Sequence, residues 1–173
     1  MCRMLSRIIG AKLREAREDD LPGILEIYND AVLNSTATFE IEPYSVERRK
    51  TWFSIHGGRY PLIVAEEQQG KIAGYCCISP FRQSAGYRRT AELSVYVHKE
   101  SRRKGLASLM VEEIIARARD LGFHSIVSCI AGSNEASIKL HERLGFEFVG
   151  HLRQVGFKFS SWQDDVFYQL LLR

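Results

Sequence analysis

The residues Ser101–Met110, with the sequence SRRKGLASLM, place three consecutive cations before a glycine and a helix-like apolar pattern. The first N–H groups of a helix have no intrahelical partners, and the helix dipole makes that end partly positive. Small residues at Gly105 and Ala107 would let a phosphate approach this backbone, and the three cations would add charge. From this loop alone, a phosphate cradle and a solvated helix start both remain open.

Other phosphate-binding patterns are absent from the sequence. It contains neither G-x-x-x-x-G-K-[ST] nor G-x-G-x-x-G, which disfavours the usual ATP and dinucleotide sites. A nucleic-acid patch would need more basic residues with interleaved aromatic residues, and the net charge is only +3. We therefore expect no nucleic-acid partner.

The elements that position this loop follow from hydrophobic periodicity and turn residues. Strands are predicted at 12–17, 62–67, 72–81, 88–98, 124–130, 146–159 and 166–172. Helices are predicted at 21–32, 46–55, 105–121 and 134–144. The order β-α-α-β-β-β-α-β-α-β-β indicates an α/β (α+β) fold with a mixed central sheet flanked by helices.

Length and composition favour one globular domain. The chain has 173 residues, of which 45% are apolar and 26% charged. Residues 1–12 hold three cations and no acid, so we expect a basic tail there and the domain at 13–173. No apolar run approaches the ~20 residues of a membrane span, so no membrane partner is expected.

The cysteines are Cys2, Cys76, Cys77 and Cys129. Two of them are adjacent on a predicted strand, so their side chains should point to opposite faces and should not pair. No C-x-x-C motif and no zinc-ligand spacing is present, so no metal is expected. Reduced thiols in a cytoplasmic protein are the simplest interpretation.

Two separated motifs carry a family resemblance. The strand LSVYV, the loop RRKGLA, the long helix and the later NEASIKLHERLGF together resemble the acetyl-CoA site of the GNAT superfamily of N-acetyltransferases. The order of elements also matches that fold, over about residues 13–172. The segments TATFE, PFRQSAGYRRTAELSVYV, LHERLGF and GFKFSSWQDDVFYQ further resemble the phosphinothricin N-acetyltransferase branch. Members of that branch acetylate the α-amino group of phosphinothricin, methionine sulfoximine or related small amino-acid analogues.

The resemblance implies which residues bind acetyl-CoA. The strand backbone should run beside the pantetheine arm, and the loop should hold the pyrophosphate. Asn134 should hydrogen-bond the cofactor, although the same residue type is also a common helix N-cap. The expected cofactor-binding residues are Val95, Tyr96, Val97, Arg102, Arg103, Lys104, Gly105, Leu106, Ala107, Ser108 and Asn134.

The resemblance also implies the chemistry. A free α-amino group has a pKa of about 7.7–8.0, so a base must remove its proton before attack. Glu92 matches the acidic residue of the branch, which is regarded as that base. His141 stands in LHE, where many superfamily members have tyrosine, and it either donates a proton to the thiolate or merely packs there. Direct transfer in a ternary complex requires no nucleophilic cysteine.

The substrate side is implied by the branch alone. A carboxylate and a tetrahedral polar group call for a cation, hydroxyl groups and an aromatic wall. Ser84 replaces an arginine of some relatives, which weakens the case for phosphinothricin itself. The expected substrate contacts are Phe39, Arg82, Tyr87 and Thr90.

Two other functions remain open at this stage. The first is an acetyltransferase for another amine metabolite or a protein N-terminus. The second is an acyl-CoA-binding module without catalytic activity. The presence of Glu92 argues against the idle module. Branch members are commonly dimers, so the resemblance also suggests a homodimer.

Overall fold

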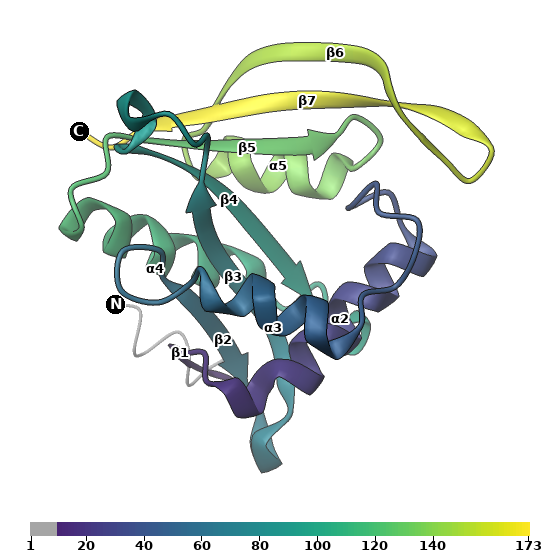
Figure 1. The fold of residues 1–173 in the computed structure, drawn as a ribbon, viewed down its shortest axis with the longest axis vertical. Coiled ribbons are helices and arrows are strands. Elements are labelled where there is room, and N and C mark those ends of the chain that lie inside the picture. Colours follow the sequence, from purple (N-terminus) through teal and green to yellow (C-terminus); the bar gives the residue numbers. More distant parts are fainter. Residues whose placement is uncertain (1–9) are drawn as a thin grey trace.

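A seven-stranded mixed sheet forms the centre of the protein in a computed structural model that describes residues 10–173 (Figure 1). Its order is β1-β2-β3-β4-β5-β7-β6, and only β4 and β5 pair in parallel. The strands are β1 (Lys12–Glu15), β2 (Leu62–Glu66), β3 (Ile72–Pro80), β4 (Thr90–Val97), β5 (Ser125–Ala131), β6 (Glu147–Lys158) and β7 (Ser161–Leu171). The helices are α2 (Leu21–Asn34), α3 (Val46–Ser54), α4 (Leu106–Asp120) and α5 (Glu135–Arg143). This order confirms the predicted fold class.

The helices cover both faces of the sheet. Apolar residues of α4 and α5 pack with Cys76 on one face, and residues of α2 and α3 pack with Cys77 on the other. The two adjacent thiols therefore point in opposite directions, as predicted, and both are buried and free. Cys2 lies outside the described residues.

The β4–β5 pair separates partway along its length. The parallel register runs from Thr90 opposite Ser125 to Glu92 opposite Val127 and ends there. Beyond that point β4 continues along β3 to Val97, whereas β5 continues along β7. Figure 1 shows the two strands diverging. Glu92 thus stands at the apex of a V-shaped opening in the sheet.

The hairpin of β6 and β7 is longer than the sequence indicated. We predicted that the last strand begins at Val166, but β7 begins at Ser161, because the polar run before Val166 pairs with β6. Phe159 and Ser160 connect the strands and both have positive φ, 51° and 58°, as a tight two-residue hairpin turn requires. The hairpin projects from the body of the molecule (Figure 1).

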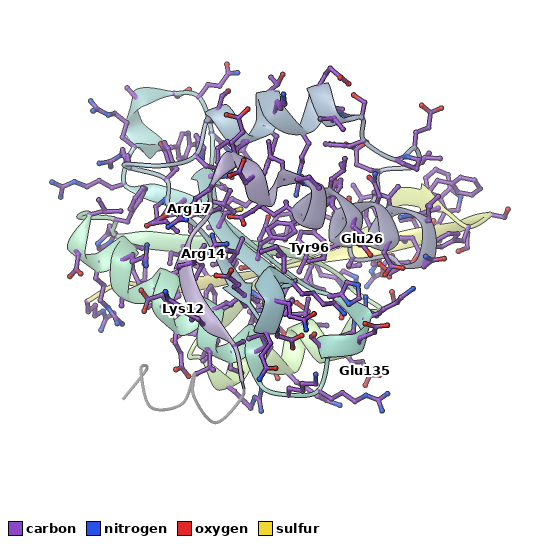
Figure 2. All side chains as sticks on the ribbon, turned by 90° about the horizontal axis from the view of Figure 1, so that it is seen from below. Lys12, Arg14, Arg17, Glu26, Tyr96 and Glu135 are labelled. Carbon is purple, nitrogen blue, oxygen red and sulfur yellow. The ribbon has the colours of Figure 1, made fainter. Side chains whose placement is uncertain are left out.

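At the other edge of the sheet, Arg14 on β1 forms a cluster of ion pairs; Figure 2 labels this residue. Its guanidinium donates to both carboxylate oxygens of Asp20 at 2.7 Å and to Glu66 at 2.6 Å. Most of the predicted basic tail, residues 1–9, lies outside the described residues, and the domain boundary at residue 12 stays a prediction. Within 10–173, no helix is long and apolar enough to cross a membrane.

Candidate active site

A cleft of about 630 Å³ opens where β4 and β5 separate. Its walls come from the end of α2 and the segment after it, from β4, from the loop before α4 and from the start of α5. Every predicted cofactor residue except Lys104 lines it: Val95, Tyr96, Val97, Arg102, Arg103, Gly105, Leu106, Ala107, Ser108 and Asn134. The structure therefore gathers two sequence motifs, about 30 residues apart, around one cavity.

The start of α4 is arranged to receive an anion. Gly105 is its N-cap with φ +79°, a left-handed conformation that suits glycine, and no side chain in the described part of the chain caps the helix. The first turn also contains no acidic residue. Its N–H groups and the positive end of the helix dipole therefore face the cleft without a competing carboxylate from that turn.

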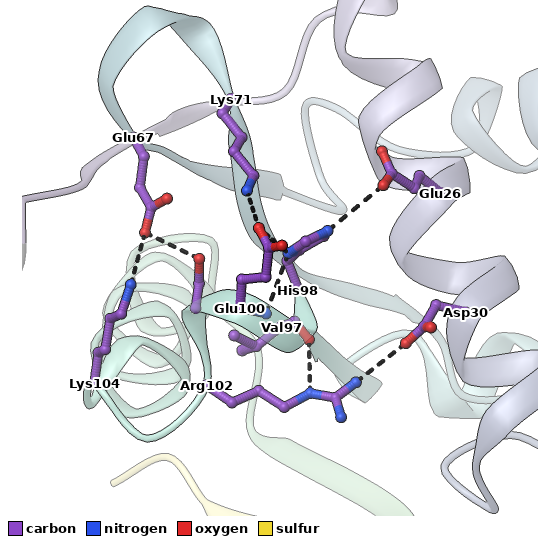
Figure 3. A network of polar contacts seen from close by, with 10 residues as sticks. Glu26, Asp30, Glu67, Lys71, Val97, His98, Glu100, Arg102 and Lys104 are labelled. Atoms are coloured by element: carbon purple, nitrogen blue, oxygen red, sulfur yellow. Dashed lines mark hydrogen bonds and ion pairs between the residues drawn. The ribbon is translucent and has the colours of Figure 1, made fainter.

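The cations beside this helix start differ in their partners (Figure 3). Arg102 donates to the Val97 carbonyl at 3.2 Å and lies 3.4 Å from a carboxylate oxygen of Asp30 on α2. Lys104 instead lies 3.6 Å from Glu67, before β3, and does not line the cleft. Its role as a cofactor ligand stays a prediction.

Asn134 lines the cleft and is also the N-cap of α5. Its Oδ1 accepts from the backbone N–H of Ser137 at 3.2 Å, so it caps α5. The cap uses only the oxygen, which leaves the amide NH₂ as a donor at the cleft wall.

Glu92 lies at the apex of the opening, half-buried, in register with Ser79 of β3. Burial raises the pKa of its carboxyl group above the usual range, the Arg82 guanidinium opposes that rise, and the Asp165 carboxylate adds to it. A carboxylate with a raised pKa is a better match to proton transfer near neutral pH.

Asp165 and Cys129 were not predicted as site residues. The thiol of Cys129 on β5 donates to the Asp165 carboxylate on β7. The Asp165 carboxylate raises the pKa of Glu92, and the Glu92 carboxylate raises the pKa of Cys129. Burial, and then the two carboxylates, raise the pKa of Cys129 to about 12, so this thiol is not a nucleophile at neutral pH. Extending the alternation of β7 back through WQDD would have placed Asp165 on this face.

His141 is buried at 2% exposure on α5 and does not line the cleft. Its Nδ1 lies 2.7 Å from the Ser137 carbonyl, which can only accept, so Nδ1 carries the proton. Burial lowers the pKa of the imidazole, which favours the neutral form. The remaining ring nitrogen, Nε2, is buried without a partner among the described residues, and in this tautomer it is an acceptor.

The predicted substrate contacts fall into two groups. Arg82 lies over the rings of Phe81 and Tyr87, at 5.1 and 5.9 Å, and Thr90 is two residues before Glu92 on β4, hence on the same face. Phe81, which contacts Tyr87 edge-on at 5.6 Å, was missed because its aromatic partner is brought close only by the loop. Phe39 lies on the segment after α2 and packs against β6 at Gly156.

Comparison with known proteins gives this cleft its context. Residues 13–167 match the model of the acetyltransferase (GNAT) domain. An L-methionine sulfoximine/L-methionine sulfone acetyltransferase of Pseudomonas paraeruginosa is 44% identical over 165 residues, 95% of this chain and 96% of that protein. A phosphinothricin N-acetyltransferase of Streptomyces coelicolor is 34% identical over 91% of this chain and 94% of its own length.

Solved structures agree with these relatives. A phosphinothricin acetyltransferase of Sinorhizobium meliloti in complex with acetyl-CoA has the same fold, as does a Salmonella typhimurium structure described as the putative acetyltransferase yncA with acetyl-CoA, which superposes with a TM-score of 0.89. The value for the Sinorhizobium meliloti structure is 0.91, at 39% identity, covering 94% of this chain and 89% of that one. The chain belongs to the GNAT acetyltransferase family and is an N-acetyltransferase.

Proposed function

We propose that the protein transfers the acetyl group of acetyl-CoA to the α-amine of a small amino-acid analogue such as methionine sulfone, methionine sulfoximine or phosphinothricin. One observation carries this proposal. Glu92, whose pKa is raised, stands where the β4–β5 pairing ends, three residues before the cleft-lining Val95, and Arg82 acts electrostatically on its carboxyl group. The names of the relatives support the same substrate class.

The residues of the cleft fit acetyl-CoA. The N–H groups at the start of α4 and the nearby Arg102 and Arg103 suit a pyrophosphate. The edge of β4 that no longer pairs with β5 offers backbone groups to an extended, amide-bearing arm. The Asn134 amide is a further donor. Bound there, acetyl-CoA would supply an activated thioester.

The chain's own groups would manage the proton. An amino acid enters with a protonated α-amine, and the Glu92 carboxylate removes one N–H proton directly or through a water. The neutral nitrogen would then form its new bond to the acetyl carbon as the carbon–sulfur bond breaks. The second proton that the nitrogen releases on becoming an amide would pass, directly or through a water, to the departing thiolate. Arg82 would hold the substrate's anionic or strongly polar group. We propose that the neutral His141 supports α5 instead of donating the last proton.

We also propose that the protein forms a homodimer through the outer half of the β6–β7 hairpin. Phe159 and Trp162 are 54% and 60% exposed there, and Phe157 contacts Trp162 at 5.2 Å. Adjacent exposed aromatic and branched residues on a projecting hairpin are typical of a contact surface. Sedimentation analysis of the wild type and of Trp162→Ser tests this, and a monomeric wild type would refute it.

The function is tested by measuring free CoA release with purified protein and acetyl-CoA. The acceptors are L-methionine sulfone, L-methionine sulfoximine, phosphinothricin, unmodified amino acids and a panel of peptides. We expect turnover with the amino-acid analogues and a product acetylated at the α-nitrogen, which mass spectrometry identifies. Turnover confined to peptides would replace this substrate class with a protein N-terminus, and no turnover with any amine would refute the proposal.

A further inference from the structure

Lys158, the last residue of β6, is a buried cation that the proposed chemistry does not use. It is only 4% exposed, and within residues 10–173 its ammonium forms no ion pair shorter than 4 Å. Its two hydrogen bonds go to backbone carbonyls, of Ser35 at 2.8 Å and of Thr38 at 2.7 Å. A lysine buried without a direct ion pair is costly even with the Glu40 carboxylate acting on it from further away, so its two hydrogen bonds indicate a specific role.

Both carbonyls belong to the segment 35–40, which follows α2 and which we name the strap. Ser35, Thr36 and Ala37 of the strap line the cleft. Phe39, further along the strap, does not line the cleft, and its ring packs against β6. A Cβ atom built on Gly156 would lie 2.4 Å from the Phe39 ring. The strap therefore joins the cleft wall to the aromatic residue expected at the amino-acid site.

The two halves of the strap are held differently. Its first half has several fastenings besides Lys158: Ser35 bonds to Ala31 at the end of α2, and the Ala37 carbonyl accepts from Tyr96 at 3.3 Å. In its second half, the Thr38 carbonyl accepts from Lys158 of β6, whereas the Glu40 carboxylate accepts from Tyr44 and Arg48 outside the sheet. The Thr38 hydroxyl, by contrast, bonds to Tyr28 of α2 and to the strap's own backbone.

We propose that Lys158 is a positioning residue that clasps the second half of the strap to β6 and so fixes Phe39 as a wall of the amino-acid site. The role of Phe39 rests on the proposed function. The clasp itself rests on the two hydrogen bonds, the burial of Lys158 and the contact of Phe39 with Gly156. Its effect should therefore fall on amino-acid binding more than on cofactor binding.

The first test is Lys158→Met, which keeps the length and apolar stem of the side chain but removes the donors. We expect the KM for the amino-acid substrate to rise about ten- to a hundredfold, as for the loss of charge-assisted hydrogen bonds. The kcat and the Kd for acetyl-CoA should change by less than about threefold, because the first half of the strap keeps its other fastenings. Lys158→Arg, which still donates to two carbonyls, should recover part of the loss.

Two further variants separate positioning from general stability. Gly156→Ala keeps Lys158 but displaces the Phe39 ring, and it should raise the same KM. Lys139→Met removes a lysine from the exposed face of α5 and should change neither constant. An effect in which KM and kcat worsen together with a falling Tm, without rescue by Lys158→Arg, would reduce Lys158 to a structural residue and overturn the proposal.

Amide hydrogen exchange tests the clasp without any substrate. In Lys158→Met the amides of residues 36–40 should exchange about tenfold faster or more, while those of β3 and α4 stay protected. Unchanged exchange in the strap would overturn the proposal whatever the kinetics. A wild type that acetylates no amino acid would refute the proposed function, yet the exchange result would still decide whether the clasp exists.

Discussion

The two sides of Glu92 are built in different ways. On the side where we propose that acetyl-CoA binds, the cleft is lined by backbone features: the part of β4 that no longer pairs with β5, a glycine with positive φ, and a helix start that no described side chain caps. On the side where we propose that the acceptor binds, two ionisable side chains act on Glu92: Arg82 lowers its pKa and Asp165 raises it. Backbone geometry thus defines the first side, and side-chain charge defines the second.

This difference predicts how each side responds to change. A backbone site tolerates most side-chain substitutions but not a change that fills its space or its φ angle. A side-chain site should respond to single charge changes, with effects on substrate choice and on the pH profile. The following variants test whether the division holds.

The largest effect is expected for Glu92→Gln, which keeps the shape but removes the proton acceptor. Turnover near pH 7 should fall by roughly 10²–10⁴, and the loss should shrink at higher pH, where more of the amine is already neutral. Steady-state kinetics between about pH 6 and pH 10, a range that includes the reference pKa of the α-amine, measures this loss of turnover. A Gln variant with wild-type turnover at pH 7 would remove Glu92 from the mechanism.

Arg82→Ala should lower kcat/KM for the amino acid by about ten- to a hundredfold, with little change in acetyl-CoA affinity. Arg82→Lys should recover more of the loss with a phosphinate than with a neutral sulfone, because a point charge still attracts an anion. The removal of Arg82 should also raise the pKa of Glu92 further, which moves the acidic limb of the rate profile to higher pH. Equal kinetics on every substrate would place Arg82 outside the acceptor site.

Gly105→Val should weaken acetyl-CoA binding about tenfold or more, since a branched residue crowds the helix start and strains the left-handed backbone by roughly 1–2 kcal/mol. Gly122→Val is the matched control. That glycine also has positive φ, but it follows the other end of α4 and no atom lies near its Cβ position. Calorimetry should show a loss of affinity for Gly105→Val alone, and equal affinities would move the phosphate site elsewhere.

Asp165→Asn should give the smallest effect, a shift of the acidic limb to lower pH by less than about one unit. Asp165 raises the pKa of Glu92, so its neutralisation lowers that pKa and leaves more of the base ionised below neutrality. The maximal rate should change little. A limb that stays in place would show that Glu92 and Asp165 do not interact in the working enzyme.

The sequence indicated the lining of the cleft better than the surroundings of Glu92 for a physical reason. Residues 102–108 are contiguous, and local helix and glycine rules suffice to describe them. Asp165, by contrast, reaches the site only through the pairing of β7 with β5, and Lys158 meets its partners 120 and 123 residues away. The polar run before Val166 also lacked the apolar alternation that marks a strand, so the register that places Asp165 was not visible.

The ending of the β4–β5 pairing also bears on how the molecule opens. Three register pairs, from Thr90–Ser125 to Glu92–Val127, join the antiparallel block β1–β4 to the block β5–β7–β6 across the sheet. Within each block, the strands pair over longer stretches, and the apolar cluster beneath α4 and α5 packs against both blocks. Because the two blocks share only this short strand pairing, it can open locally at a lower free energy than global unfolding requires. Glu92, which we propose as the base, is the last residue of that pairing, so mild heating or denaturant should abolish activity before either block unfolds.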